Sequence, residues 1–102
     1  MSYNNLNGSD RHFETKTGKT AIFIAHDGCY INCVAVYDLP YENTNRFLPS
    51  SKLVDSFSIT PYAMLTHEMD GNELKTVCLV LREGKTDAEF FREVQQWIIE
   101  RY

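Results

Sequence analysis

The stretch that most constrains the fold is the C-terminal one, residues 86–102, because it matches an amphipathic helix with its own start signal. Thr86 and Glu89 have the spacing of a capping box, in which each side chain satisfies a backbone N–H group at the helix start. Apolar side chains then recur at helical spacing on one face: Phe90, Phe91, Val94, Trp97 and Ile98. Burying a stripe of this size gives a gross gain of about 10 kcal/mol before entropy costs. We therefore predict a C-terminal helix packed by this stripe onto a core.

Composition narrows the class of protein. The chain has 102 residues, 43% of them hydrophobic, and a formal net charge of −4. We expect one domain over residues 11–102, preceded by a flexible tail over residues 1–10. The acidic balance argues against a protein that coats nucleic acid by charge alone. The sequence shows neither a signal peptide nor the roughly 18 consecutive apolar residues of a membrane span, so we predict a cytoplasmic protein without a membrane partner.

Short apolar runs separated by turn signals precede the helix and predict five or six strands. The strands are expected at residues 11–16, 20–25, 29–37, 53–60, 62–69 and 74–81. Consecutive strands tend to be neighbours in a sheet. The predicted class is therefore α+β, an antiparallel, meander-like sheet with one C-terminal helix packed across it. The first strand is the expected edge, because its charges discourage further pairing.

The Asp27-Gly28 pair is a strong signal for a two-residue hairpin turn. This turn would set Ile24 opposite Ile31, and opposite residues share a face of the sheet. We assign to the helix the face formed by Ile22, Ile24, Ile31, Cys33 and Ala35. The second face is less polar than a solvated face should be, so either the sheet curls into a half-barrel or this face meets another chain. The candidate self-association residues are Phe23, Tyr30 and Val34.

Charge predicts the register of the last hairpin. A two-residue turn at Asp70-Gly71 would place Glu68 opposite Glu73, where the carboxylates repel. A four-residue loop over residues 70–73 instead pairs Glu68 with Lys75, Leu65 with Cys78, and Met64 with Leu79. Cross-strand pairs contribute a few tenths to about 1 kcal/mol each, so the second register is favoured. The run 77–81 is apolar on both faces, which predicts a central strand.

The segment 38–52 has no periodicity and is rich in turn residues. Long loops without regular structure are uncommon in compact domains and are often functional. Aromatic and arginine side chains in such a loop are typical of interface hot spots. The candidate partner-binding residues are Leu39, Tyr41, Arg46, Phe47 and Leu48, with Ile99 on the polar face of the helix. The alternative is that the apolar members fold back and cap the core, and that Ile99 is an isolated exposed residue.

Two further hypotheses concern chemistry. The thiols of Cys29, Cys33 and Cys78 are expected to be free and structural, with no metal and no cofactor, because their number and spacing do not suit zinc. His26 could activate Cys29 across the hairpin, which gives a thiol-dependent enzyme as one alternative. The other alternative is a single-stranded nucleic-acid binder whose basic and stacking residues are Arg11, Lys16, Lys19, Phe23, Tyr30 and Tyr37.

The predicted function is a non-enzymatic protein-binding module that inhibits or regulates a partner protein. This hypothesis joins the loop over residues 38–52 with the second apolar face of the sheet and the lack of a catalytic motif. A homodimer through the second sheet face is compatible with each of the three functions. The sequence does not name the partner protein.

Overall fold

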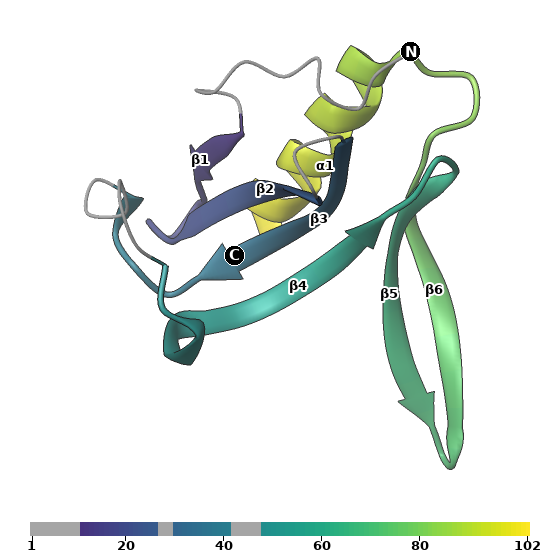
Figure 1. Ribbon diagram of the computed structural model, residues 1–102, viewed down its shortest axis with the longest axis horizontal. Helices are drawn as coiled ribbons and strands as arrows, with labels where there is room; N and C mark the ends of the chain where they lie inside the picture. The colour runs from purple at the N-terminus through teal and green to yellow at the C-terminus, as the bar shows by residue number, and fades with distance from the viewer. Residues whose placement is uncertain (1–10, 27–29, 42–47) are drawn as a thin grey trace.

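The computed structural model describes residues 11–26, 30–41 and 48–102. Six strands form one antiparallel sheet in sequential order, and a single long helix lies across one face of it (Figure 1). The elements are β1 (His12–Glu14), β2 (Thr20–His26), β3 (Tyr30–Tyr37), a short 3-10 helix η2 (Ser50–Lys52), β4 (Leu53–Ile59), β5 (Ala63–Asp70), β6 (Glu73–Leu81) and α1 (Asp87–Arg101). The predicted α+β class and meander order are confirmed. The predicted tail lies outside the described residues.

Helix α1 begins as the sequence predicts. The Glu89 N–H group donates to Thr86 Oγ1 at 3.2 Å, and the Thr86 N–H group donates to Glu89 Oε1 at 2.9 Å. The buried members of the apolar stripe are Phe90, Phe91, Val94 and Ile98. Trp97 is half-buried and packs edge-on against the ring of Phe57, 5.3 Å away. The stripe therefore holds the helix on the sheet, as predicted.

Replacing Thr86 with alanine is expected to lower the free energy of unfolding by about 1 kcal/mol, because the variant loses the hydroxyl that accepts the Glu89 N–H bond. Chemical denaturation measures this loss. Ser51→Ala, at an exposed position of η2, is the control and should stay within about 0.5 kcal/mol of the parent. Equal losses in the two variants would contradict a stabilising cap.

Glu89→Gln tests the other half of the capping box. The hydrogen bond from the Thr86 backbone lowers the pKa of Glu89 below its ordinary value. The ionised Glu89 carboxylate therefore stabilises the folded chain above the ordinary pKa of glutamate. This stabilisation is lost as the pH falls through the lowered pKa of Glu89. We expect Glu89→Gln to be less stable than the parent at neutral pH and to lose that difference in acid.

The helix covers a different face of the β2–β3 hairpin from the one predicted. The core contains Phe23 and Val34, which are 3% and 0% exposed, and the Phe23 ring lies 5.4 Å from that of Phe91. Ile24, assigned to the helix from the sequence, is 38% exposed on the opposite, outer face. The prediction was wrong because alternation identifies two faces but does not say which one is covered. The buried face carries Ala21, Phe23, Val34 and Val36.

A bulge in β3 changes the register of this hairpin. Ile24 pairs with Cys33 rather than Ile31, and Ala25 pairs with Ile31. A bulge opposes two residues to one, so the side chains beyond it change face. Ile31 thereby joins the core and is 1% exposed. The predicted two-residue turn is also wrong, because His26 pairs with Tyr30.

The register of the last hairpin is confirmed over most of its length. Glu68 pairs with Lys75 and Leu65 pairs with Cys78, as charge predicted. Two details differ: the strands continue to a pair between Asp70 and Glu73, which leaves a two-residue turn, and a bulge pairs Met64 with Val80 instead of Leu79. Residues 77–81 do not form a central strand, because β6 is the edge of the sheet. Cys78 and Leu81 are accordingly exposed.

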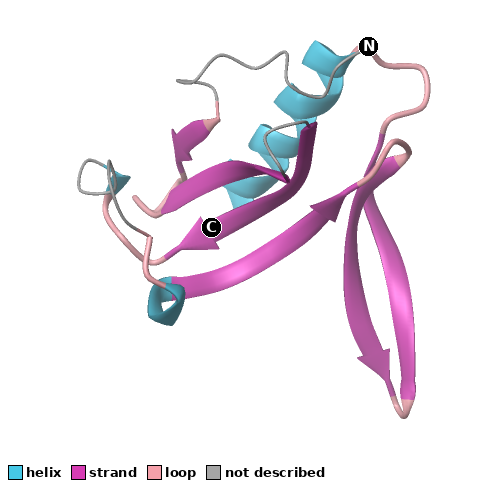
Figure 2. Ribbon diagram, in the orientation of Figure 1, coloured by secondary structure: helices cyan, strands magenta, loops and turns pink. Residues whose placement is uncertain are grey.

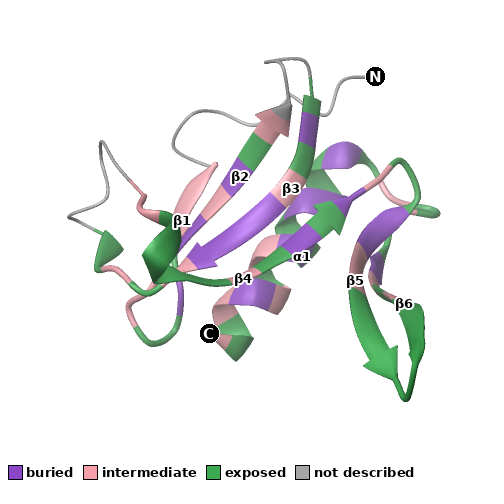
Figure 3. Ribbon diagram, turned by 60° about the horizontal axis from the view of Figure 1, so that its bottom comes forward, coloured by how far each residue is buried: buried purple, intermediate pink, exposed green. Residues whose placement is uncertain are grey.

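The β5–β6 hairpin leaves the body of the molecule as a two-stranded arm. Only two residue pairs join β5 to β4: Ser58 with Leu65 and Ile59 with Met64. Beyond them the two strands diverge, and the hairpin extends away from the helix and the other strands (Figures 1 and 2). Figure 3 shows that its outer part is exposed, whereas the start of β5 is buried.

Candidate binding surface

The two faces of the arm differ in chemistry. Residues paired across the hairpin share a face. The apolar arm face consists of Leu65 with Cys78, His67 with Thr76, and Met69 with Leu74. The charged arm face consists of Thr66 with Val77, Glu68 with Lys75, and Asp70 with Glu73. Such alternation is typical of an antiparallel strand with one covered face. Here the side that should be covered is open, since Met69 and Leu74 are 65% and 67% exposed.

Local sequence builds this arm. Gly71, at a φ of 65°, supplies the left-handed conformation that the tight turn at the tip needs. Across the arm, His67 Nδ1 lies 3.1 Å from Thr76 Oγ1, which links the two strands on the apolar arm face. An isolated two-stranded hairpin is only marginally stable in water. The arm is therefore an element that gains stability when its apolar face is covered.

The apolar arm face continues across the sheet. Ile24 pairs with Cys33, Cys33 with Ser58, Ser58 with Leu65, and Leu65 with Cys78, which forms one row over five strands. This row lies on the outer face, opposite α1. We call the row and the two outer arm pairs the uncharged strip: Ile24, Cys33, Ser58, Leu65, Cys78, His67, Thr76, Met69 and Leu74. None of these described residues is Asp, Glu, Lys or Arg, although 24% of the chain is.

Exposure varies along the uncharged strip. Ile24 is exposed and Cys33 is half-buried, and burial raises the pKa of the Cys33 thiol while a hydrogen bond from the Phe57 backbone partly opposes this rise. Cys78, on the arm, is exposed. Tyr30 lies near the Ile24 end and is 52% exposed. The strip therefore offers solvent both apolar side chains and thiols.

Three strand edges beside the strip lack partners in the described part of the chain, and one of them is residues 66–70 of β5, which pair only with β6. Residues 53–57 of β4 pair only with β3, because the pairing with β5 begins at Ser58. The outer edge of β6 has no neighbour in the sheet. Unpaired edges present backbone N–H and C=O groups to other chains. Leu53 and Val54, on the open part of β4, are 43% and 46% exposed.

A cleft of about 580 Å³ opens where the arm meets the body. Its wall residues are Pro61, Tyr62, Leu81, Arg82, Glu83, Lys85 and Asp87. Tyr62 and Leu81 are 80% and 55% exposed. Behind them, Arg82 Nη1 bonds to Asp87 Oδ1 at 2.6 Å, and Lys85 Nζ bonds to Glu93 at 2.6 Å. The mixed charges on this wall select no single class of ligand.

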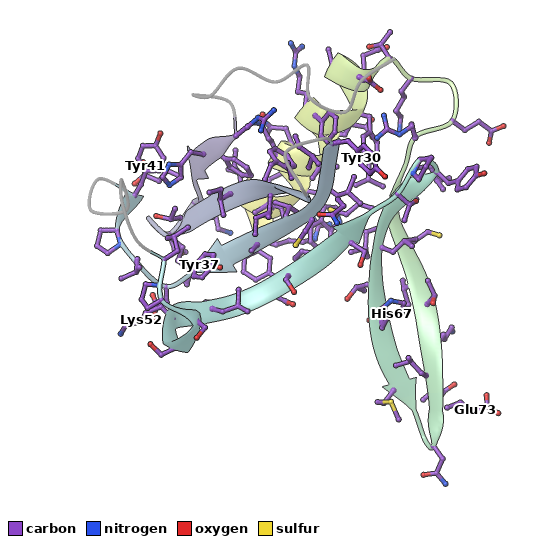
Figure 4. All side chains as sticks on the ribbon, in the orientation of Figure 1. Tyr30, Tyr37, Tyr41, Lys52, His67 and Glu73 are labelled. Atoms are coloured by element: carbon purple, nitrogen blue, oxygen red, sulfur yellow. The ribbon has the colours of Figure 1, made fainter. Side chains whose placement is uncertain are left out.

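The structure describes three of the five loop residues predicted to bind a partner: Leu39, Tyr41 and Leu48. Leu39 and Leu48 are half-buried. The Tyr41 hydroxyl donates to the His12 carbonyl at 3.2 Å, and its ring lies edge-on against His12, 5.2 Å away. These contacts hold Tyr41 against β1, and Tyr41 is 36% exposed. Figure 4 shows Tyr41 at the end of the sheet opposite the arm that carries His67.

The other residues predicted to bind a partner are Arg46, Phe47 and Ile99. Arg46 and Phe47 lie outside the described residues. Ile99 is half-buried, and its carbonyl accepts a hydrogen bond from the Lys16 N–H group at 3.0 Å. Binding of a partner by these residues stays a prediction.

The residues predicted for self-association are corrected in part. Phe23 and Val34 belong to the core, so they form no second surface. Only Tyr30 of the three is exposed. Sequence reasoning missed Met69 and Leu74, although their alternation with charged neighbours was visible. The missing information was that nothing in the described chain covers this side of the hairpin.

The chemical alternatives find no additional support. Cys29 lies outside the described residues, so its proposed pairing with His26 stays a hypothesis. Phe23, one of the residues predicted to stack on single-stranded nucleic acid, is buried in the core. Lys19 Nζ lies 2.9 Å from Thr17 Oγ1 and 3.5 Å from the Tyr102 carbonyl. Within residues 11–26, 30–41 and 48–102, no three His, Cys, Asp or Glu side chains are grouped as metal ligands would be.

The chain was compared with protein families, curated proteins and solved structures. No family model, curated protein or solved structure gives a match to this chain. In the described part of the chain, no helix has the length and apolar character that crossing a membrane requires.

Proposed function

We propose that this chain is a non-enzymatic protein-binding module whose binding surface is the apolar arm face. The observation that carries the proposal is the pair of Met69 and Leu74, each about two-thirds exposed on an arm that extends from the body. Exposed apolar patches of this kind mark sites of interaction. Covering the pair would also stabilise a hairpin that is marginal alone.

Strand edges support a protein as the ligand. A binding chain can add to a sheet through backbone hydrogen bonds, while side-chain pockets supply specificity. The open part of β4 and the outer edge of β6 both flank the apolar arm face. The cleft framed by Tyr62 and Leu81 lies at the base of the same arm, where it could accept an apolar side chain of the bound protein. The loop over residues 38–52 stays a second, predicted surface.

Site-specific photo-cross-linking tests this function. A benzophenone amino acid replaces Met69 in one version of the full chain and Glu68 in a matched version. These neighbours are both exposed but lie on opposite arm faces. Irradiation in the cells that make the protein is expected to give a discrete protein adduct from position 69 and none from position 68. Absence of adducts from both positions, or equal labelling from both, would refute the proposal.

A further inference from the structure

We infer that the protein bound by the uncharged strip is a second copy of this chain, held about a two-fold axis. This inference rests on the proposed function and specifies its partner. In the resulting dimer, the strip of one copy packs against the strip of the other, and both charged arm faces point away from the contact.

The distribution of charge favours the strip over any other contact surface between two copies. Two chains that each carry a net charge of −4 repel one another, unless their carboxylates are kept out of the contact. The uncharged strip is the part of the described surface where this condition holds across five strands. Depletion of charged residues is also the compositional mark of the centre of an interface.

Symmetry makes the strip its own complement. A two-fold contact joins the same patch on both subunits, so a patch that contains charges of one sign is disfavoured, and an uncharged apolar patch is favoured. Met69 and Leu74 supply flexible apolar side chains, and His67 and Thr76 are already bonded to each other across the arm.

The size of the strip predicts how strong the dimer is. A standard interface contributes roughly 20–30 residues from each side. The strip contains nine residues, with Tyr30 and the open edge of β4 as neighbours. This is the core of a small interface, so we expect a reversible dimer that dissociates on dilution and not an obligate one.

Analytical ultracentrifugation of the full chain from about 1 to 300 µM tests the inference. The parent should change from monomer to dimer over this range. The double variant Met69→Gln/Leu74→Gln should weaken dimerisation at least about tenfold. The matched control is Glu68→Gln/Lys75→Gln, the adjacent pair on the charged arm face, which receives the same two glutamines and keeps the net charge. It should stay within about twofold of the parent.

Alkylation of Cys78 gives a readout that needs no variant in the strip. Cys78 is exposed on the apolar arm face, and its tryptic fragment is separate from those of the other two cysteines. Its rate of reaction with iodoacetamide should fall as protein concentration rises through the dimerisation range. If the double variant fails to fold, this measurement shows whether the strip is covered in a dimer.

Three results would overturn the inference: a parent that sediments as a monomer at every concentration, a Cys78 rate that does not depend on concentration, or a control variant that dimerises as weakly as the strip variant. If the parent is a monomer and position 69 cross-links to a different protein, the proposed function stands and only the second copy is refuted. If the parent is a monomer and position 69 forms no adduct, both fail.

Discussion

Replacing Phe91 with alanine is expected to lower the free energy of unfolding by about 4 kcal/mol, which is a large part of the total stability of a domain of this size. Phe91 is 1% exposed, and its ring contacts Phe23 at 5.4 Å and Phe90 at 5.3 Å between centroids. The substitution removes the ring contact between Phe91 on the helix and Phe23 on the sheet, and it leaves a cavity between them. The melting temperature should fall by roughly 15–30 °C, as measured by circular dichroism or calorimetry.

Three further substitutions make this prediction specific to the observed packing. Tyr62→Ala removes a large side chain that is 80% exposed, and it should change stability by less than about 0.5 kcal/mol. Phe23→Ala should approach the loss of Phe91→Ala, whereas Ile24→Ala, on the outer face, should cost far less. If Ile24→Ala were the more damaging of these two, the helix would cover the face predicted from the sequence.

The second large effect is expected at the ion pair that joins the end of the arm to the start of the helix. Asp87→Asn should lower stability by about 3 kcal/mol, because it removes the carboxylate that faces a buried guanidinium. Asp87 Oδ1 lies 2.6 Å from Arg82 Nη1, and the two side chains are only 10% and 13% exposed. The Arg82 guanidinium also lies 4.1 Å above the ring of Phe90, so the pair is part of the core boundary.

A second ion pair of the same length provides the control. Lys85 and Glu93 also lie 2.6 Å apart, but their side chains are 26% and 53% exposed. Glu93→Gln should therefore cost less than about 1 kcal/mol, because solvent screens the pair. The double variant Arg82→Met/Asp87→Leu should recover much of the loss of Asp87→Asn, because apolar replacement of both partners removes the cost of a buried charge. Equal losses from Asp87→Asn and Glu93→Gln would show that burial does not govern these pairs.

Some features of the molecule follow from interactions between residues close in sequence. The capping box depends on Thr86 and Glu89, three positions apart, and it formed as predicted. The register of the last hairpin depends on Glu68 and Lys75 near one turn, and it was predicted correctly from Leu65 to Met69. In both cases, the alternatives differ by a local hydrogen bond or charge pair, which can be compared without knowledge of the rest of the chain.

The arm shows why the candidate site could be predicted only in part. The alternation of Leu65, His67 and Met69 with polar residues is visible in the sequence, and it is compatible with a strand that has one apolar face, but it was not used to predict a site. The same pattern would fit a strand with that face buried against the helix. Whether the face is covered depends on the pairing of β5 with β4, which stops after two residue pairs.

Local patterns thus account for the helix, its cap, the strands and the pairing within the last hairpin, because period, turn chemistry and neighbouring charges act over a few residues. Tertiary structure decided three other matters: that Phe23 and Val34 face the helix, that a bulge brings Ile31 into the core, and that the arm leaves the body with Met69 and Leu74 exposed. Each of these depends on how side chains from distant segments fill one shared volume. That competition is settled only when the whole chain is packed.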